Sequence, residues 1–224
     1  MFPLGDDNSM RRSTPYVTYI LIAINVAVFL LELQNSDEFI KRWAFVPARF
    51  SADEAGNIPT IFTAMFMHGS WLHLGGNMLY LWIFGDNVED RFGHFKFLIF
   101  YLLTGIAATF AQYYVMPDSS VPNVGASGAI AGVLGAYLVT FPRARVLTLI
   151  PIFIFPWFVE IPALIYLVFW FVMQLLEGIG TLGMPVETGG VAVWAHIGGF
   201  VAGVVLVKLM QPPRRRPQPL EVRP

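Results

Sequence analysis

Six long apolar stretches constrain what this chain can fold into more than any other feature. A helix needs roughly 20 mostly apolar residues to cross a bilayer, and each stretch meets or approaches that length. Only 13% of the residues are charged, against about a quarter in an average soluble domain. We therefore predict an all-α, multi-pass integral membrane protein with six transmembrane helices. The stretches cover about 16–34, 71–88, 93–115, 126–141, 155–176 and 192–210.

The positions of Lys and Arg predict the orientation of these helices. Cytoplasmic loops of membrane proteins carry an excess of both residues. With the N-terminus inside, all but three of the 14 cations fall on the inner side, the exceptions being Lys41, Arg42 and Arg49 in the first outer loop. Both termini are thus predicted to be cytoplasmic. The predicted parts are a cytoplasmic segment at 1–15, a membrane domain at 16–210 and a disordered basic tail at 211–224.

Polar residues gather at one predicted depth of the membrane. His68, His73 and Asn77 lie at the start of the second span, Ser127 opens the fourth, and His196 lies near the start of the sixth. These three spans all run from outside to inside in the predicted topology, so their first residues share a level just below the outer surface. Ionisable and amide groups are costly in hydrocarbon. Their coincidence indicates a common functional site.

The residue types in this set predict a nucleophilic serine. A serine hydroxyl needs a base within hydrogen-bond reach, and an imidazole, which titrates near neutrality, suits that role. Ser127 follows Gly125, whose backbone can turn sharply and approach a substrate closely. No acidic residue lies close to His196 in the sequence. We therefore expect a Ser127–His196 dyad without a buried third member.

Neighbouring residues could stabilise an oxyanion and allow close helix packing. Free N–H groups at the start of the fourth span can hold a developing negative charge, and His73 and Asn77, four residues apart on one helix face, carry further donors. Gly199 and Gly203 follow the G-x-x-x-G spacing of closely packed membrane helices, and Gly128 offers a smooth surface on the fourth span.

Several other classes of function are disfavoured by the sequence. The absence of Cys excludes disulfides, thiolate nucleophiles and Cys-ligated metal sites. There is no H-E-x-x-H motif, and His68 and His73, five apart, do not share a helix face suited to zinc. A haem protein with two axial histidines would need histidine pairs on facing helices. A net charge of −1 gives no indication of nucleic-acid binding. We predict no metal and no cofactor.

Three motifs together resemble the rhomboid family of intramembrane serine proteases. They are H-G-S-W-L-H-L-G-G-N at 68–77, G-A-S-G at 125–128 and A-H-I-G-G-F-V-A-G at 195–203, in that order. The resemblance implies that Ser127 is the nucleophile and His196 the general base. It also implies hydrolysis through an acyl-enzyme, without metal or cofactor, of transmembrane segments of other membrane proteins near the outer membrane surface.

The resemblance assigns supporting roles as well. It places Asn77, His73 and the Ser127 N–H at the oxyanion, His68 in support of the site, and Gly199 and Gly203 at a close helix contact. It further implies that the fifth span and the loop after it, about 155–191, form a gate for substrate entry. The aromatic residues of this segment are Trp157, Phe158, Trp170 and Phe171.

Two positions depart from the family pattern. A Trp-Arg pair found in many relatives is replaced by Pro59 and Thr60, and an aromatic residue that stacks on the catalytic imidazole is replaced by Ala131. Other groups must then anchor the first loop and hold the His196 ring. The alternative function is that of a catalytically inactive relative that binds transmembrane clients. The lack of a targeting presequence favours a bacterial plasma membrane, whereas the substrate and the oligomeric state are not indicated by the sequence.

Overall fold

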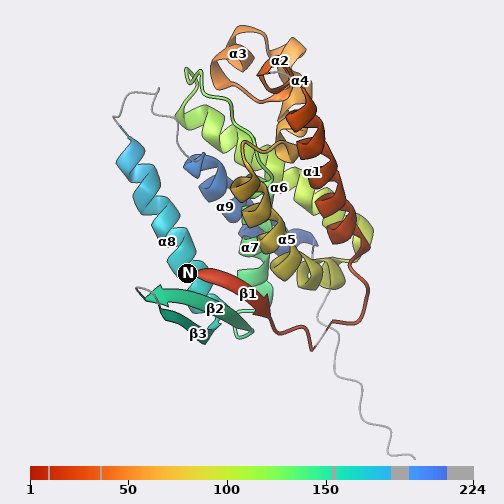
Figure 1. The fold of residues 1–224 in the computed structure, drawn as a ribbon, viewed down its shortest axis with the longest axis vertical. Helices are drawn as coiled ribbons and strands as arrows, with labels where there is room; N and C mark the ends of the chain where they lie inside the picture. The colour runs from red at the N-terminus through yellow and green to blue at the C-terminus, as the bar shows by residue number, and fades with distance from the viewer. Residues whose placement is uncertain (10, 36, 153–154, 183–191, 211–224) are drawn as a thin grey trace, which may run out of the picture.

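The computed structural model describes residues 1–224 apart from 10, 36, 153–154, 183–191 and 211–224, so the predicted tail lies outside the described residues. Helices dominate the described part, and one three-stranded sheet lies at one end of it (Figure 1). The six long helices are α1 (Tyr16–Gln34), α5 (Trp71–Phe92), α6 (His94–Val115), α7 (Ser127–Thr140), α8 (Ala163–Thr181) and α9 (Val193–Met210). The short helices are α2 (Asp37–Trp43), α3 (Pro47–Ala52), α4 (Glu54–Thr63) and the 3₁₀ turn η1 (Ala64–Phe66).

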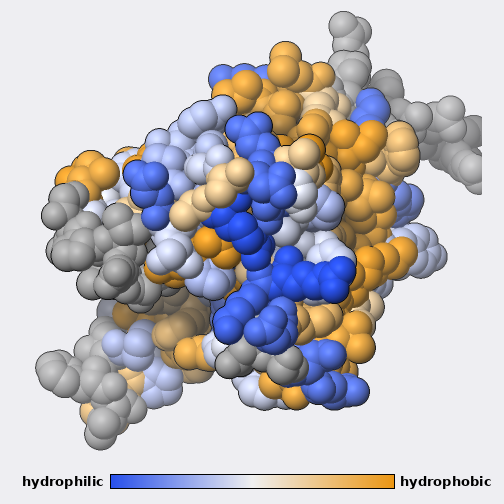
Figure 2. Space-filling view, turned by 90° about the horizontal axis from the view of Figure 1, so that it is seen from above, coloured by the Kyte–Doolittle hydropathy of each residue, from blue (hydrophilic) through white to orange (hydrophobic). Residues whose placement is uncertain are grey.

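These long helices account for the six apolar stretches. Within the described residues, α1, α6, α8 and α9 are long and apolar enough to cross a membrane, and α7 is equally apolar but shorter. The prediction of a mostly helical chain with membrane-crossing helices is therefore confirmed. Figure 2 looks down on the end that carries α2–α4, where hydrophilic residues gather across the face and hydrophobic residues cover its flank. An apolar flank and a polar end are what a membrane protein requires.

The predicted start of the fifth span, at residue 155, was wrong. Residues 155–162 form strand β3 (Phe155–Pro162), and α8 begins only at Ala163. Proline inside a helix removes a hydrogen bond and clashes with the preceding turn, at a cost of about 3 kcal/mol. Pro156 and Pro162 therefore delay the helix, and Pro162 stands at its N-cap. Trp157 and Phe158 accordingly lie in a strand and not on the fifth helix.

The sheet also corrects the expectation of an all-α fold. Strands β1 (Phe2–Asp6), β2 (Arg145–Ile152) and β3 pair antiparallel in that order. Val146 and Thr148 of β2 are buried, while Leu147 between them is 39% exposed. This alternation is the period of a half-buried strand. In Figure 1 the sheet lies beside the first turns of α8, at the opposite end from α2–α4.

Helix α7 lies at the centre of the bundle. All of its residues from Gly128 to Tyr137 are buried, and it packs against α5, α6, α8 and α9. Its contact with α9 is a backbone contact, because a Cβ at Gly199 would overlap the carbonyl oxygen of Gly128, and one at Gly203 would overlap that of Gly132. Only glycine permits this approach. The first turns of α7 and α9 are thereby brought together.

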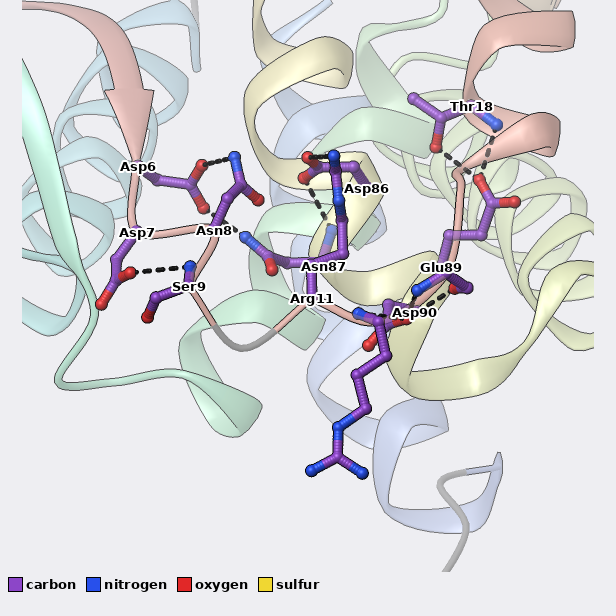
Figure 3. Close-up of polar contacts among 12 residues, drawn as sticks. Asp6, Asp7, Asn8, Ser9, Arg11, Thr18, Asp86, Asn87, Glu89 and Asp90 are labelled. Carbon is purple, nitrogen blue, oxygen red and sulfur yellow. Dashed lines mark hydrogen bonds and ion pairs between the residues drawn. The ribbon is translucent and has the colours of Figure 1, made fainter.

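A polar cluster fixes the start of α1 to the end of α5 (Figure 3). The buried carboxylate of Glu89 accepts hydrogen bonds from the backbone N–H of Val17 (2.9 Å) and of Thr18 (2.7 Å), the Thr18 hydroxyl (2.7 Å) and His94 Nδ1 (2.5 Å). The first N–H groups of a helix have no partner within it. Glu89 thus caps α1 from a neighbouring helix.

The loop between α1 and α5 is anchored without the Trp-Arg pair. The Arg49 guanidinium donates to the carbonyl oxygens of Lys41 and Ala44. Phe45 pairs through its backbone with Asn123, with N···O distances of 3.3 and 2.7 Å. These contacts tie the loop to itself and to the segment just before α7.

Candidate active site

Ser127 and His196 contact each other directly. The distance between Ser127 Oγ and His196 Nε2 is 2.8 Å. Ser127 is the first residue of α7 and His196 lies in the first turn of α9, so the glycine contact between the two helices sets their separation. His196 is only 8% exposed. The pair is a hydroxyl–imidazole hydrogen bond in a largely buried setting.

The other ring nitrogen of His196 contacts a residue that sequence reasoning missed. Gln174 Oε1, on α8, lies 2.7 Å from His196 Nδ1. The Trp170 ring, one turn earlier on α8, lies 6.0 Å from the imidazole, centroid to centroid, at an interplanar angle of 39°. Gln174 and Trp170 therefore contact the His196 ring, on which Ala131 has no aromatic ring to stack. The signal in the sequence was an amide within an apolar span, a position that is usually functional.

A constrained turn precedes Ser127. Gly125 has a φ of +133°, and a Cβ there would lie 2.9 Å from both Cε1 and Nε2 of His73. The backbone conformation and the close imidazole both require glycine. Gly125 N–H donates to the carbonyl of Ala64 at 2.9 Å, which fixes the turn. Ser127 is thereby presented at the start of its helix beside His73.

A cavity of about 590 Å³ opens in front of these residues. Its lining includes Ser127, His196, His73, Asn77 and Trp170. Asn77 is 8% exposed, and among the described residues its Nδ2 has no hydrogen-bond partner. A buried donor without a partner is costly, and here it borders the same cavity as Ser127. The predicted oxyanion donors and the serine thus share one cavity.

His68 lies next to this cavity and is not among its lining residues. Its backbone N–H donates to the Glu32 carboxylate at 3.1 and 3.3 Å, and its ring meets that of His73 edge to face, with centroids 5.1 Å apart. Burial, and secondarily the neighbouring His73, lowers the pKa of His68 to about 4. His68 thus packs against His73 outside the cavity lining, and its supporting role stays a prediction.

Comparison with known proteins shows which family the chain belongs to. The sequence model of the Rhomboid domain matches residues 55–213, most of the chain and all of the elements that form the cavity. The chain belongs to the rhomboid family. Together with its apolar helices, this makes it an integral membrane protein.

Relatives come from fungi, bacteria and animals. The chain is 30% identical to "Rhomboid protein 1, mitochondrial" of Saccharomyces cerevisiae over 84% of this chain and 51% of that protein. It is 35% identical to "Rhomboid protease GluP" of Bacillus subtilis over 57% of this chain and 25% of that protein. Human "Presenilin-associated rhomboid-like protein, mitochondrial" is 30% identical over 60% of this chain and 36% of its own length. The chain therefore spans about half or less of these three relatives.

Proposed function

We propose that this rhomboid protein is an intramembrane serine endopeptidase with a Ser127–His196 dyad. The observation that carries the proposal is the 2.8 Å contact between Ser127 Oγ and His196 Nε2, bordering a cavity at the first turns of apolar helices. A base within hydrogen-bond reach is what an activated serine requires. The name of the Bacillus relative, a rhomboid protease, supports the same activity.

The reaction follows from the positions of the donors and acceptors. Ser127 Oγ attacks the carbonyl carbon of the scissile bond while His196 Nε2 takes the hydroxyl proton. Asn77 Nδ2 and the Ser127 N–H donate to the oxyanion, with His73 beside them. His196 then gives its proton to the leaving amine, and the C–N bond breaks to leave an acyl-enzyme. Water, deprotonated by His196, hydrolyses the ester and restores Ser127.

The substrate and the topology belong to the same proposal. Six spans with both termini in the cytoplasm place the cavity near the outer surface, so the substrates are membrane proteins cut within or beside a transmembrane segment. The membrane domain is 16–210, flanked by 1–15 and by the tail 211–224. Relatives named for mitochondria, together with one from Bacillus, do not support the predicted bacterial plasma membrane over other membranes.

Labelling with a fluorescent fluorophosphonate tests the activated serine. We expect the detergent-purified protein to be labelled, and Ser127→Ala and His196→Ala each to lose labelling completely while keeping the thermal unfolding profile of the wild type. Ser120→Ala, at an exposed serine outside the cavity lining, serves as the matched control and should still be labelled.

A second assay follows cleavage of a single-span reporter protein reconstituted with the enzyme in liposomes. Cleavage that requires both Ser127 and His196 supports the proposal. A folded wild type that neither labels nor cleaves, yet retains the reporter on co-purification, would instead establish the inactive client-binding relative.

A further inference from the structure

The hydrogen bonds of His196 define which ring nitrogen carries a proton. Nδ1 faces Gln174 Oε1 at 2.7 Å and Nε2 faces Ser127 Oγ at 2.8 Å. An amide oxygen has no hydrogen to give, so Nδ1 must be the donor in the first contact. A neutral imidazole has one proton, so Nε2 then presents its lone pair to the serine hydroxyl. This is the tautomer that a general base requires.

Packing against α8, the helix that carries Gln174, holds the His196 ring in that orientation. Trp170 and Gln174 are four residues apart on α8, and both face the imidazole. Trp170 also packs on Phe200 of α9, with centroids 6.0 Å apart. Ala131 of α7, which borders the same cavity and is fully buried, has no ring to stack on the imidazole. The orientation of the base is therefore set by α8, and not by a neighbour of the serine.

We infer that Gln174 is a positioning residue for the catalytic base, one that selects the Nδ1–H tautomer of His196. The inference rests on the proposed protease function. It places a third side chain behind the dyad, neutral where soluble serine proteases use a buried carboxylate. A neutral amide fixes the tautomer without adding charge to a site enclosed by apolar helices, where an unpaired carboxylate would be costly.

Kinetic comparison of three variants separates positioning from packing. Gln174→Met keeps the length of the side chain and removes the acceptor. We expect it to lower the rate of reporter cleavage by about 10- to 100-fold, less than the roughly 10⁴-fold that follows loss of the tautomer-fixing carboxylate in a soluble protease. Gln174→Glu keeps an oxygen acceptor and should cleave faster than Gln174→Met. A side chain that only filled space would give the opposite order, because methionine suits an apolar contact and a buried carboxylate does not.

Gln112→Met is the matched control for the loss of a buried amide. Gln112, on α6, accepts from the Ala195 N–H at 3.3 Å and does not contact the imidazole. The same substitution there should reduce cleavage by less than about threefold. Equal losses in Gln112→Met and Gln174→Met would overturn the inference, since both would then act through the stability of α9.

Nitrogen NMR of histidine-labelled protein tests the tautomer without using cleavage. The chain has four histidines, so the His196 signals can be assigned by comparison with His196→Ala. We expect a protonated Nδ1 and an unprotonated Nε2 in the wild type, and proton transfer to Nε2 in Gln174→Met. An unchanged tautomer in that variant would refute the positioning role even in an active enzyme. A wild type that carries the proton on Nδ1, a Gln174→Met variant that carries it on Nε2, and no cleavage of the reporter would leave the Gln174–His196 relationship standing and overturn the protease function.

Discussion

At the scale of single residues, the site combines polar groups that have hydrogen-bond partners with one that has none among the described residues. The two ring nitrogens of His196 both have partners, whereas Asn77 Nδ2 has none among the described residues. A protein keeps a buried donor unpaired at a cost of about 1–3 kcal/mol. Under the proposed function, this donor at the edge of the cavity would pair with an oxygen of the substrate.

Replacement of Asn77 by alanine should therefore slow cleavage and leave the fold intact. Loss of a single oxyanion donor typically costs about 10²–10³ in rate. We expect about 10- to 100-fold for Asn77→Ala, because the Ser127 N–H and His73 remain beside the oxyanion. Rates of reporter cleavage at saturating enzyme measure the effect. Asn35→Ala, an exposed amide at the end of α1, is the control and should cleave as the wild type does; a loss in Asn77→Ala no larger than in this control would remove Asn77 from the oxyanion site.

The contact between Ser127 and His196 could be expected from the sequence, whereas the contact between Gln174 and His196 could not. Ser127 and His196 lie within recognisable glycine-containing motifs, and a rare polar residue in an apolar span invites a functional reading. Gln174 belongs to no such motif. Its contact with His196 depends on how α8 packs against α9, and no periodicity within one helix contains that information.

At the scale of elements, capping between helices replaces capping within them. The N-cap position of α1 is Pro15, which offers no side-chain acceptor. Glu89 of α5 supplies the acceptor instead and satisfies two N–H groups of the first turn of α1. The carboxylate also lies at the positive end of the helix dipole. One side chain thus joins the first span to the second.

Removal of this carboxylate should loosen α1. We expect Glu89→Ala to lower the free energy of unfolding by roughly 2–4 kcal/mol, since each buried donor left unpaired costs about 1–3 kcal/mol. Unfolding in mixed detergent–SDS micelles, followed by circular dichroism, measures the change. Glu177→Ala, at an exposed position of α8, should stay within about 0.5 kcal/mol of the wild type. Identical unfolding curves for Glu89→Ala and the wild type would show that α1 is held by its apolar surface alone.

Apolar length predicted five of the long helices within a few residues and misplaced the start of α8. Hydrophobicity reports burial in lipid or protein and does not distinguish a strand from a helix over a short run. The prolines at 156 and 162 carried the missing information. Strand β1 was beyond reach for another reason: it pairs with β2 across more than 130 residues of sequence, and its pattern becomes meaningful only beside its partner.

At the scale of the whole molecule, the topology makes a prediction that the sequence is unusually well suited to test. The chain has no cysteine, so single cysteines can be introduced without background. Cysteines at Ser9 and Arg143 should be shielded from an impermeant maleimide in sealed, right-side-out vesicles, whereas cysteines at Ser51 and Ser120 should react. Labelling in permeabilised vesicles controls for reactivity. Reaction of Ser9→Cys in sealed vesicles would show that the orientation is the reverse of the proposed one.

The sheet links residues 2–6 to α8, the helix whose Gln174 and Trp170 contact the His196 ring. Strand β1 pairs with β2, β2 pairs antiparallel with β3, and β3 continues without a loop into α8. Among the described residues β1 pairs with β2 alone, so a competing strand that displaced β1 would pull on the β2–β3 pair, and through it on the first turn of α8. The serine would stay where α7 holds it, while the amide behind the imidazole shifted. Under the proposed function and topology, cleavage could therefore be controlled from the side of the membrane opposite to the cleaved bond, through the length of α8.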